Sequence, residues 1–447
     1  MKIQPQPLQR IGVIFLLIAA SAEFLARGPC RIEQSAGWND FVSPYIQSRI
    51  WVYGEDPYLS GNLVRFWPAG ATIPQFVLRE SGDARLVERR GIPSPYPPTT
   101  FVLLAPLVLL PWKAALSIWI AVSVLAVGIA LLALARVTGI GLSTLQGLLF
   151  LALCLGLAPI QTGLATANPA ILGVALAVVA LWFAARRQDI FCGLLIAGSI
   201  CLKPTIGVWF FFFYVVARRW KVVATACGVS ALIASVAVGR MLAVSWFSSY
   251  EIVTKHMFAV GSINDFSTAN PVWFQMVNLQ GPVFVMTQDA WLANLIVLLV
   301  GISLLAAWTV LRLSSESGVG NLLAVSALST LSLLPTYHRL FDASLLILPI
   351  AWAMSSKKET VWTNRFLTIS LTLPFLIPGG VLLSQLSDRL RMPQYRLFAR
   401  CWQVIAVAHE NWCLLFLGLL LLYEMRRPSP TTIDDGRIAA DIKSPSR

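Results

Sequence analysis

The chain has 447 residues, of which 57% are hydrophobic and 12% charged, and its 34 lysines and arginines outnumber its 21 acidic residues. Long apolar runs recur from end to end, which predicts an all-α polytopic membrane protein and excludes a water-soluble one. These apolar runs are continuous, whereas the strands of a β-barrel would be short segments in which apolar and polar residues alternate. Because the basic residues cluster at the ends of the apolar runs, they indicate membrane topology and anionic headgroups rather than a nucleic-acid partner.

The N-terminal part of the chain predicts the first crossing and a large loop. Residues 11–26 are apolar and follow a short basic stretch, so we expect an uncleaved first helix with a cytoplasmic N-terminus. Residues 27–98 then form a first external loop. Its many prolines and its tryptophans predict short interfacial helices joined by turns.

Further apolar segments follow, and several are shorter than the ~20 residues that a straight span needs. They are 99–110, 114–135, 142–157, 164–185, 190–202, 206–217, 222–244, 290–311, 321–334, 340–354, 366–383 and 402–423. The basic residues between them predict about twelve transmembrane helices, provided that 99–110 crosses only partly. Residues 1–425 then form one membrane domain with a second large external loop at 245–289, and residues 426–447 form a disordered cytoplasmic tail.

Charged residues that interrupt the apolar runs are candidate catalytic or binding residues. An ionised side chain at membrane depth costs about 2.5–3.5 kcal/mol, so its presence there calls for a function. Lys203, which precedes Pro204, predicts a nearby anion, and snorkelling to the headgroups is the alternative. Asp342 stands one helical turn after His338 and can orient its imidazole, while Arg339 suits a phosphate. A local interhelical clamp is the alternative for this second group.

Two polar features outside those segments complete the candidates. Asn168 precedes a proline at a helix start and predicts an N-cap, with no further function as the alternative. In the first external loop Asp40 is the predicted catalytic base, with Glu55 and Asp56 as rivals. Because Pro57 holds Asp56 extended, Asp56 is predicted to form a turn or to cap the next helix.

Several short motifs occur in the order and spacing of glycosyltransferase family 87, which the chain resembles over about residues 11–425. They are Asp40-Phe41 with Tyr45, Gly54-Glu55-Asp56-Pro57-Tyr58, Tyr96-Pro97-Pro98, Lys203-Pro204, Arg218-Arg219-Trp220, and His338 with Asp342. The chain departs from the family at Ala167-Asn168-Pro169, where a Gly-Gln pair is expected before the asparagine. The second external loop matches only loosely, apart from Asn270 and its aromatic neighbours.

The resemblance implies a GT-C-like bundle in a bacterial inner membrane. Such an enzyme moves a sugar, by family default mannose, from a polyprenyl-phosphate donor to a hydroxyl of a lipid or glycan acceptor on the external or periplasmic face. Asp40 matches the family's base, and attack opposite the phosphate would invert the anomeric carbon. Lys203 and Arg339 are expected to bind the donor phosphate, with His338 as a further catalytic group.

Supporting or sugar-binding residues are expected around these groups, including aromatic rings that suit stacking on a pyranose. They are Trp38, Phe41, Tyr45, Asp56, Tyr58, Tyr96, Asn168, Asn270 and Asp342. No metal or other cofactor is expected, because a monophosphate donor leaves as a stabilised anion. The alternatives are a lipid-linked-sugar flippase or secondary transporter, which would more often show internal repeats, and a non-catalytic scaffold.

Overall fold

The computed structural model describes residues 7–32, 40–68, 94–314, 321–355, 362–377, 379–389 and 396–427. Within these ranges the chain folds into helices and contains no β-strand, apart from one isolated bridge between Met276 and Arg339. The predicted all-α class is therefore confirmed. The predicted C-terminal tail from residue 428 onward and Trp38 lie outside the described residues.

The helices follow the apolar segments closely. In chain order they are α1 (Pro7–Arg27), η1 (Pro29–Arg31), α2 (Val42–Val52), α3 (Ser60–Arg65), α6 (Pro98–Leu104), η2 (Ala105–Leu109), α7 (Trp112–Thr138), α8 (Leu145–Gly156), α9 (Ala158–Ala165), α10 (Pro169–Ala185), α11 (Asp189–Leu202), α12 (Pro204–Val216), α13 (Trp220–Gly239), α14 (Trp246–Met257), η3 (Trp273–Gln275), α15 (Gln280–Thr287), α16 (Ala290–Ser314), α17 (Asn321–Ser332), η4 (Leu340–Leu346), α18 (Ile347–Ala353), α19 (Trp362–Thr372), η5 (Leu373–Leu376), α20 (Gly379–Arg389), α21 (Arg396–Cys401), the π-helix η6 (Trp402–Val407) and α22 (His409–Arg426).

Only some of these helices are long enough to cross a membrane unaided. By length and composition, 4 of the described helices qualify, namely Pro7–Arg31, Trp112–Thr138, Trp220–Gly239 and Ala290–Ser314, or up to 7 if each of three bent pairs forms one span. Several other apolar helices have 10–17 residues, below the ~20 of a straight crossing. The apolar helices indicate a membrane protein, and the count of about twelve spans stays a prediction.

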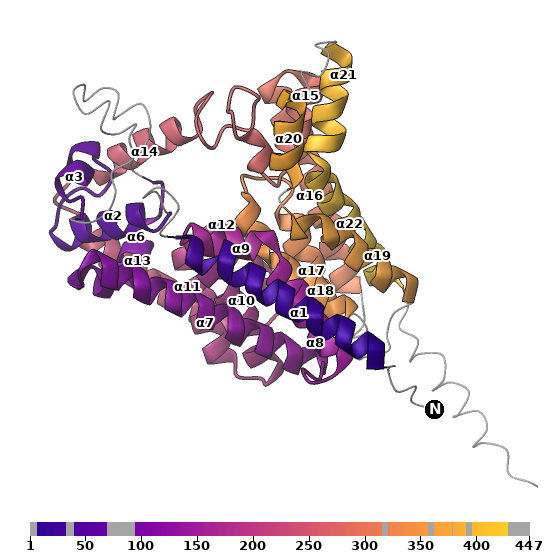
Figure 1. Cartoon of the computed structure of the whole chain (residues 1–447). Helices are drawn as coiled ribbons and strands as arrows, with labels where there is room; N and C mark the ends of the chain where they lie inside the picture. Colours follow the sequence, from indigo (N-terminus) through magenta and orange to yellow (C-terminus); the bar gives the residue numbers. More distant parts are fainter. Residues whose placement is uncertain are drawn as a thin grey trace, which may run out of the picture.

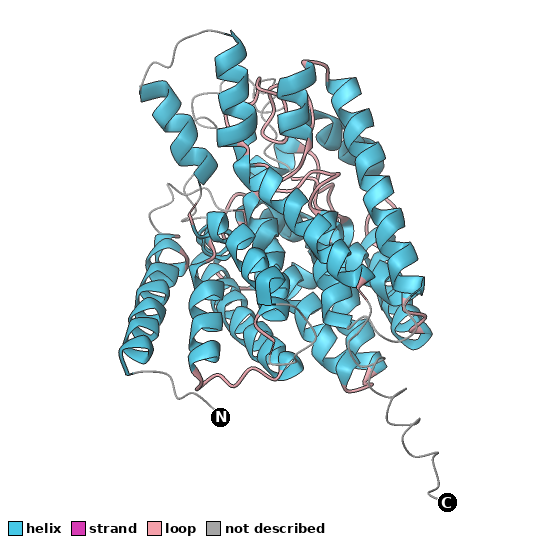
Figure 2. Ribbon diagram, turned by 90° about the vertical axis from the view of Figure 1, so that its right-hand side faces the viewer, coloured by secondary structure: helices cyan, strands magenta, loops and turns pink. Residues whose placement is uncertain are grey.

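The predicted first external loop contains two of the short helices. Figure 1 shows α2 and α3 beside α14, on the left of the view, whereas α15, α20 and α21 lie at the upper right. Figure 2 shows the same body from the side, built from helices joined by short loops. The predicted short helices are therefore present, but α2 is packed inward against α6 and η2, with nearly all of its residues buried.

Helix α10 is the central element that positions the site. It packs against both α7 and α11, and its buried face is rich in alanine. Small side chains allow neighbouring helix backbones to approach closely, which favours dense packing between apolar helices. The N-terminus of α10 consequently has a fixed position among its neighbours.

The break between α11 and α12 follows from one proline. Because Pro204 has no backbone N–H, the helix cannot continue through it, and Lys203 adopts φ −145° and ψ 82°. The carbonyl of Cys201, freed near the break, accepts hydrogen bonds from the hydroxyls of Thr99 at 3.1 Å and Thr100 at 2.8 Å. The predicted interruption at Lys203 is confirmed, and it ties α6 to the end of α11.

Replacing Gly207 in α12 with alanine is expected to destabilise this junction. A Cβ there would lie 2.4 Å from the backbone nitrogen of Ile200 in α11, and a backbone atom cannot move aside as a flexible side chain can. We expect a loss of about 1–3 kcal/mol, seen as a lower thermal unfolding midpoint in detergent. The matched control is Gly228→Ala in α13, where a Cβ meets nothing within 4 Å. Equal midpoints for the two variants would contradict the expectation.

Candidate active site

Asp40 lies two residues before the start of α2 and is anchored by the aromatic residue that follows it. The ring of Phe41 stacks on Trp119 at 4.8 Å and on Trp112 at 5.9 Å, and it has an exposed fraction of 0%. Tyr45 is 2% exposed, and its hydroxyl donates to the carbonyl of Leu110 at 3.0 Å. Both rings are covered by other side chains in this structure, and the stacking of Phe41 and Tyr45 on a sugar stays a prediction. They hold Asp40 in place.

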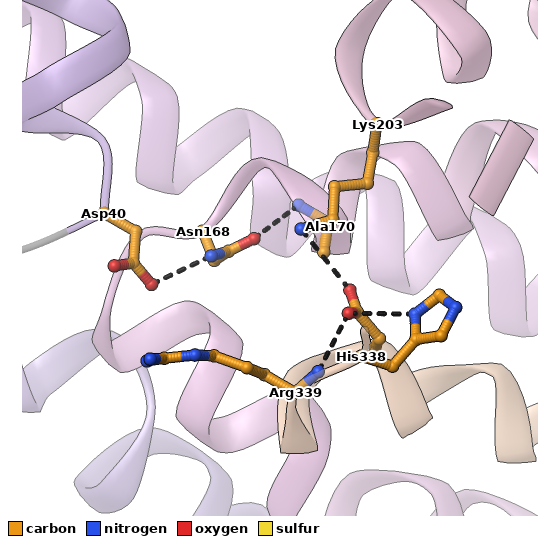
Figure 3. Close-up of polar contacts among 7 residues, drawn as sticks. Asp40, Asn168, Ala170, Lys203, His338 and Arg339 are labelled. Carbon is orange, nitrogen blue, oxygen red and sulfur yellow. Dashed lines mark hydrogen bonds and ion pairs between the residues drawn. The ribbon is translucent and has the colours of Figure 1, made fainter. Parts of the chain in front are cut away.

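The turn before α10 makes the other contacts to Asp40. The backbone N–H of Asp40 donates to the carbonyl of Thr166 at 2.6 Å, and Asn168 Nδ2 donates to Asp40 Oδ2 at 2.8 Å (Figure 3). Asn168 Oδ1 accepts from the backbone N–H of Ala170 at 2.8 Å, so the predicted N-cap is confirmed. One asparagine therefore both begins α10 and orients the candidate base. Among the described residues, no group donates a hydrogen bond to the second carboxylate oxygen, Asp40 Oδ1.

Ala167 and Trp119 complete the support of this turn. Ala167 has φ 53°, in the left-handed region that alanine rarely adopts, and it is buried. Its carbonyl accepts a hydrogen bond from Trp119 Nε1 at 2.9 Å, while the Trp119 ring stacks on Phe41. Trp119 thus contacts both segments that hold Asp40. The sequence offered no local signal for this role, because Trp119 lies within an ordinary apolar helix.

A second polar cluster is centred on Asp342, whose side chain is 0% exposed. Its Oδ2 lies 3.1 Å from His338 Nδ1 and accepts the backbone N–H of Arg339 at 3.1 Å, and its Oδ1 lies 3.7 Å from Lys203 Nζ (Figure 3). The predicted orientation of His338 by Asp342 is confirmed. Lys203 is 12% exposed and pairs inward with Asp342, so its side chain does not snorkel.

His338 presents a free nitrogen to its surroundings. The carboxylate beside Nδ1 favours a proton on that atom, which leaves Nε2 as the other hydrogen-bonding atom of the ring. Nε2 is buried and has no partner among the described residues. A buried polar atom without a partner is costly, so this nitrogen is suited to meeting a ligand atom.

Arg339 reaches from this cluster toward Asp40. Figure 3 shows its side chain extending away from His338, to the side on which Asp40 and Asn168 lie. Its Nη2 donates to the carbonyl of Ile263 at 2.6 Å. Asn270 Nδ2 donates to the same carbonyl at 3.1 Å and is 1% exposed. Asn270 therefore supports the loop that contacts Arg339 and does not itself face open space.

Two tyrosines connect the two clusters electrostatically. Burial raises the pKa of Tyr96 well above its ordinary value, and the charges of Asp40 and Asp342 raise it further. Burial also raises the pKa of Tyr337, to about 12, and the same two carboxylates act on it in the same direction. Both carboxylates therefore lie near enough to the two hydroxyls to influence their pKa values. Tyr58 holds Tyr96 through a 2.6 Å hydrogen bond to its carbonyl.

The rival carboxylates of the first loop make local contacts. Asp56 Oδ1 accepts the backbone N–H of Tyr58 at 2.9 Å, which confirms the predicted turn. Glu55 forms an ion pair with Arg65. Neither side chain contacts Asp40. Among the described residues, no group of three or more His, Cys, Asp and Glu side chains could hold a metal ion.

A family model for glycosyltransferase family 87 matches residues 95–336, which is more than half of the chain. The matched segment includes Tyr96, Asn168, Lys203 and Asn270. It begins after Asp40 and ends before His338. No curated protein and no solved structure matches the chain.

Proposed function

The chain belongs to glycosyltransferase family 87 and is a glycosyltransferase, and we propose that it moves a sugar from a polyprenyl-phosphate donor to an acceptor hydroxyl. The observation that carries this proposal is the placement of Asp40. Its Oδ1 accepts no hydrogen bond from the described residues, and Arg339 extends toward it from the cluster that also contains Lys203 and His338 (Figure 3). Mannose is the expected sugar, and the external face of a bacterial inner membrane is the expected location.

The charges of the site favour a donor with one phosphate. Lys203 and Asp342 neutralise each other at 3.7 Å, and Asp40 must stay ionised to act as a base. Arg339 therefore supplies the positive charge for a ligand. A sugar phosphodiester carries one negative charge, whereas a nucleotide sugar carries a diphosphate with more. A lipid monophosphate also suits the apolar helices around the site.

The proposed reaction is a single displacement. The acceptor O–H gives its proton to Asp40 as the acceptor oxygen bonds to the anomeric carbon. The bond from that carbon to the phosphate oxygen breaks, its electron pair goes to the phosphate, and the phosphate gains one negative charge. Arg339 and Lys203 stabilise this added charge, and His338 contributes when its imidazolium form carries an N–H on Nε2 as well as on Nδ1. The stabilisation raises the rate because the added charge exists only as the transition state forms. Attack opposite the phosphate inverts the anomeric centre.

The donor class is tested with purified protein in liposomes that contain a bacterial lipid extract. We expect label to pass to an acceptor from radiolabelled polyprenyl-phosphomannose, also in the presence of EDTA, and not from GDP-mannose. Transfer from the nucleotide sugar alone would contradict the proposal. Movement of the labelled donor across the bilayer without any transfer would favour the flippase alternative.

Removing the indole N–H of Trp119 is expected to slow the reaction without weakening donor binding. Trp119→Phe keeps a ring on Phe41 but leaves the Ala167 carbonyl unpaired, so the turn that orients Asp40 loosens. The loss of one buried hydrogen bond predicts a fall in kcat of about tenfold, with the donor KM within about twofold. The matched control is Trp112→Phe, because Trp112 also stacks on Phe41 but is not the residue that donates a hydrogen bond to Ala167. An unchanged kcat in Trp119→Phe would remove the positioning role.

A further inference from the structure

Tyr337 immediately precedes His338 and Arg339 and has no role in the reaction described above. It lies in the connection between α17 and η4 and is half-buried. Its ring packs edge-on against Phe258 at 5.5 Å, with an angle of 88° between the ring planes. Phe258 begins the loop that also supplies the Ile263 carbonyl to Arg339. One loop therefore holds both the Tyr337 ring and the Arg339 guanidinium.

The backbone around Tyr337 is fixed by the same loop. The N–H of Val277 donates to the carbonyl of His338 at 3.0 Å, and Met276 forms the isolated bridge with Arg339. These contacts restrain the backbone of the two residues after Tyr337, and the hydrogen bond from the Arg339 N–H to Asp342 restrains it further. A hydroxyl carried on a restrained backbone and a packed ring needs little reorganisation to bind a ligand.

In the described part of the chain, the Tyr337 hydroxyl donates no hydrogen bond. Among the described side chains, Arg339 is its hydrogen-bonding neighbour. A guanidinium only donates hydrogen bonds, so Tyr337 Oη can accept from Arg339 but cannot donate to it. Arg339 Nε is buried and lacks a partner in the described part of the chain, as does His338 Nε2. Three consecutive residues thus present polar atoms suited to one oxygen-rich ligand.

We propose that Tyr337 is a donor-binding residue whose hydroxyl donates a hydrogen bond to a phosphate oxygen of the lipid-linked substrate, beside Arg339. This inference rests on the proposed function, because it assumes that the cationic cluster binds a phosphate. The neutral Tyr337 hydroxyl adds a hydrogen bond to the phosphate without adding a positive charge that Asp40 would attract. As the phosphate gains charge in the transition state the bond strengthens, so the hydroxyl contributes to kcat as well as to binding.

The ionisation of Tyr337 agrees with this role. With its pKa raised to about 12, the hydroxyl keeps its proton at every pH at which the enzyme is expected to work. The unfolded chain would lose that proton near pH 10, so any contribution of Tyr337 to stability is fully present below that pH and lost only as pH rises toward 12. Tyr337 therefore produces no pH dependence of activity in the neutral range.

The test is Tyr337→Phe, which removes the hydroxyl and keeps the ring on Phe258. We expect kcat/KM for the polyprenyl-phosphate sugar to fall by about 10- to 100-fold, which is the range for one lost bond to a charged group. We also expect the inhibition constant of polyprenyl phosphate, which has no sugar, to rise by about tenfold. The matched control is Tyr423→Phe, because Tyr423 also accepts a hydrogen bond from an arginine, Arg427, at 3.1 Å, but lies in α22.

Two results would overturn the proposal. If kcat/KM and the inhibition constant both stay within twofold of wild type, Tyr337 does not bind the donor. If the donor KM rises while the inhibition constant of polyprenyl phosphate is unchanged, the hydroxyl contacts the sugar and not the phosphate. Failure of the proposed function is distinct, since wild-type protein would then transfer nothing from the polyprenyl-phosphate donor. Should Tyr337→Phe not fold, Phe258→Leu leaves the hydroxyl but loosens its ring, and an unchanged inhibition constant there would count against the proposal.

Discussion

Replacing Asp40 with asparagine is expected to abolish sugar transfer while leaving donor binding intact. Asparagine has nearly the same shape, and its side-chain oxygen can still accept the hydrogen bond from Asn168 Nδ2. It cannot take a proton from the acceptor, and the loss of a general base lowers rates by about 10²–10⁴-fold. The measurement is the initial rate of label transfer in liposomes, together with binding of polyprenyl phosphate to the same variant.

The matched control for Asp40→Asn is Glu55→Gln. Glu55 is a carboxylate of the same loop but is paired with Arg65, so its removal is expected to leave the transfer rate near that of wild type. A full loss of activity in Glu55→Gln with an active Asp40→Asn would reverse the assignment of the base. A loss of donor binding in Asp40→Asn would show that Asp40 supports the fold of the site and would leave its role as base without support.

Neutralising Asp342 is expected to cause the largest loss of stability. Asp342→Asn leaves Lys203 buried without a negative partner and weakens the carboxylate contact to His338. Breaking a buried ion pair from one side costs about 3–5 kcal/mol, because the remaining charge is uncompensated. Thermal unfolding in detergent should show a markedly lower midpoint, and the transfer rate should fall because Lys203 and His338 are no longer oriented.

A double variant separates the ion pair from a general packing defect. Lys203→Met combined with Asp342→Asn removes both charges, so we expect it to regain part of the lost stability without regaining activity. The control is Glu251→Gln, which breaks the exposed Glu251–Lys255 pair and should change the midpoint little. If the double variant is less stable than the sum of the two single effects predicts, the pair does not stabilise the fold in the way described.

Features of the site that depend on local chemistry could be predicted from the sequence. The break at Lys203 follows from Pro204, and the cap at Asn168 follows from its place before Pro169. The contact of His338 with Asp342 was predicted from helical spacing, but His338 and Arg339 are extended and Asp342 folds back on them from η4. In each case the residues that matter are close together in the sequence. The all-α class was likewise predictable from the apolar runs alone.

Features that depend on packing between distant segments could not be predicted. Phe41 resembled a sugar-stacking ring because its own neighbours are polar, but its stacking partners come from α7. Lys203 was predicted to need an anion, and the anion that it meets in this structure belongs to Asp342, far along the chain. The role inferred for Tyr337 has the same origin, because Phe258 and Ile263 reach its segment from another loop.

The number of membrane spans also could not be predicted from sequence patterns. Apolar segments such as 190–202 and 206–217 are too short for a straight crossing, and they form the separate helices α11 and α12 joined at Lys203. Hydrophobicity shows that such helices are buried in an apolar environment, but it does not distinguish lipid from protein around them. Twelve spans therefore stay a prediction beside the four to seven that helix length supports.

The structure of the Asp40→Asn protein with an unreacted polyprenyl-phosphate sugar tests the central claim most directly. The proposed function predicts that the phosphate lies within hydrogen-bond distance of Arg339 and Lys203, with the anomeric carbon between that phosphate and residue 40. A phosphate bound elsewhere, or a sugar whose anomeric carbon faces away from residue 40, would contradict it.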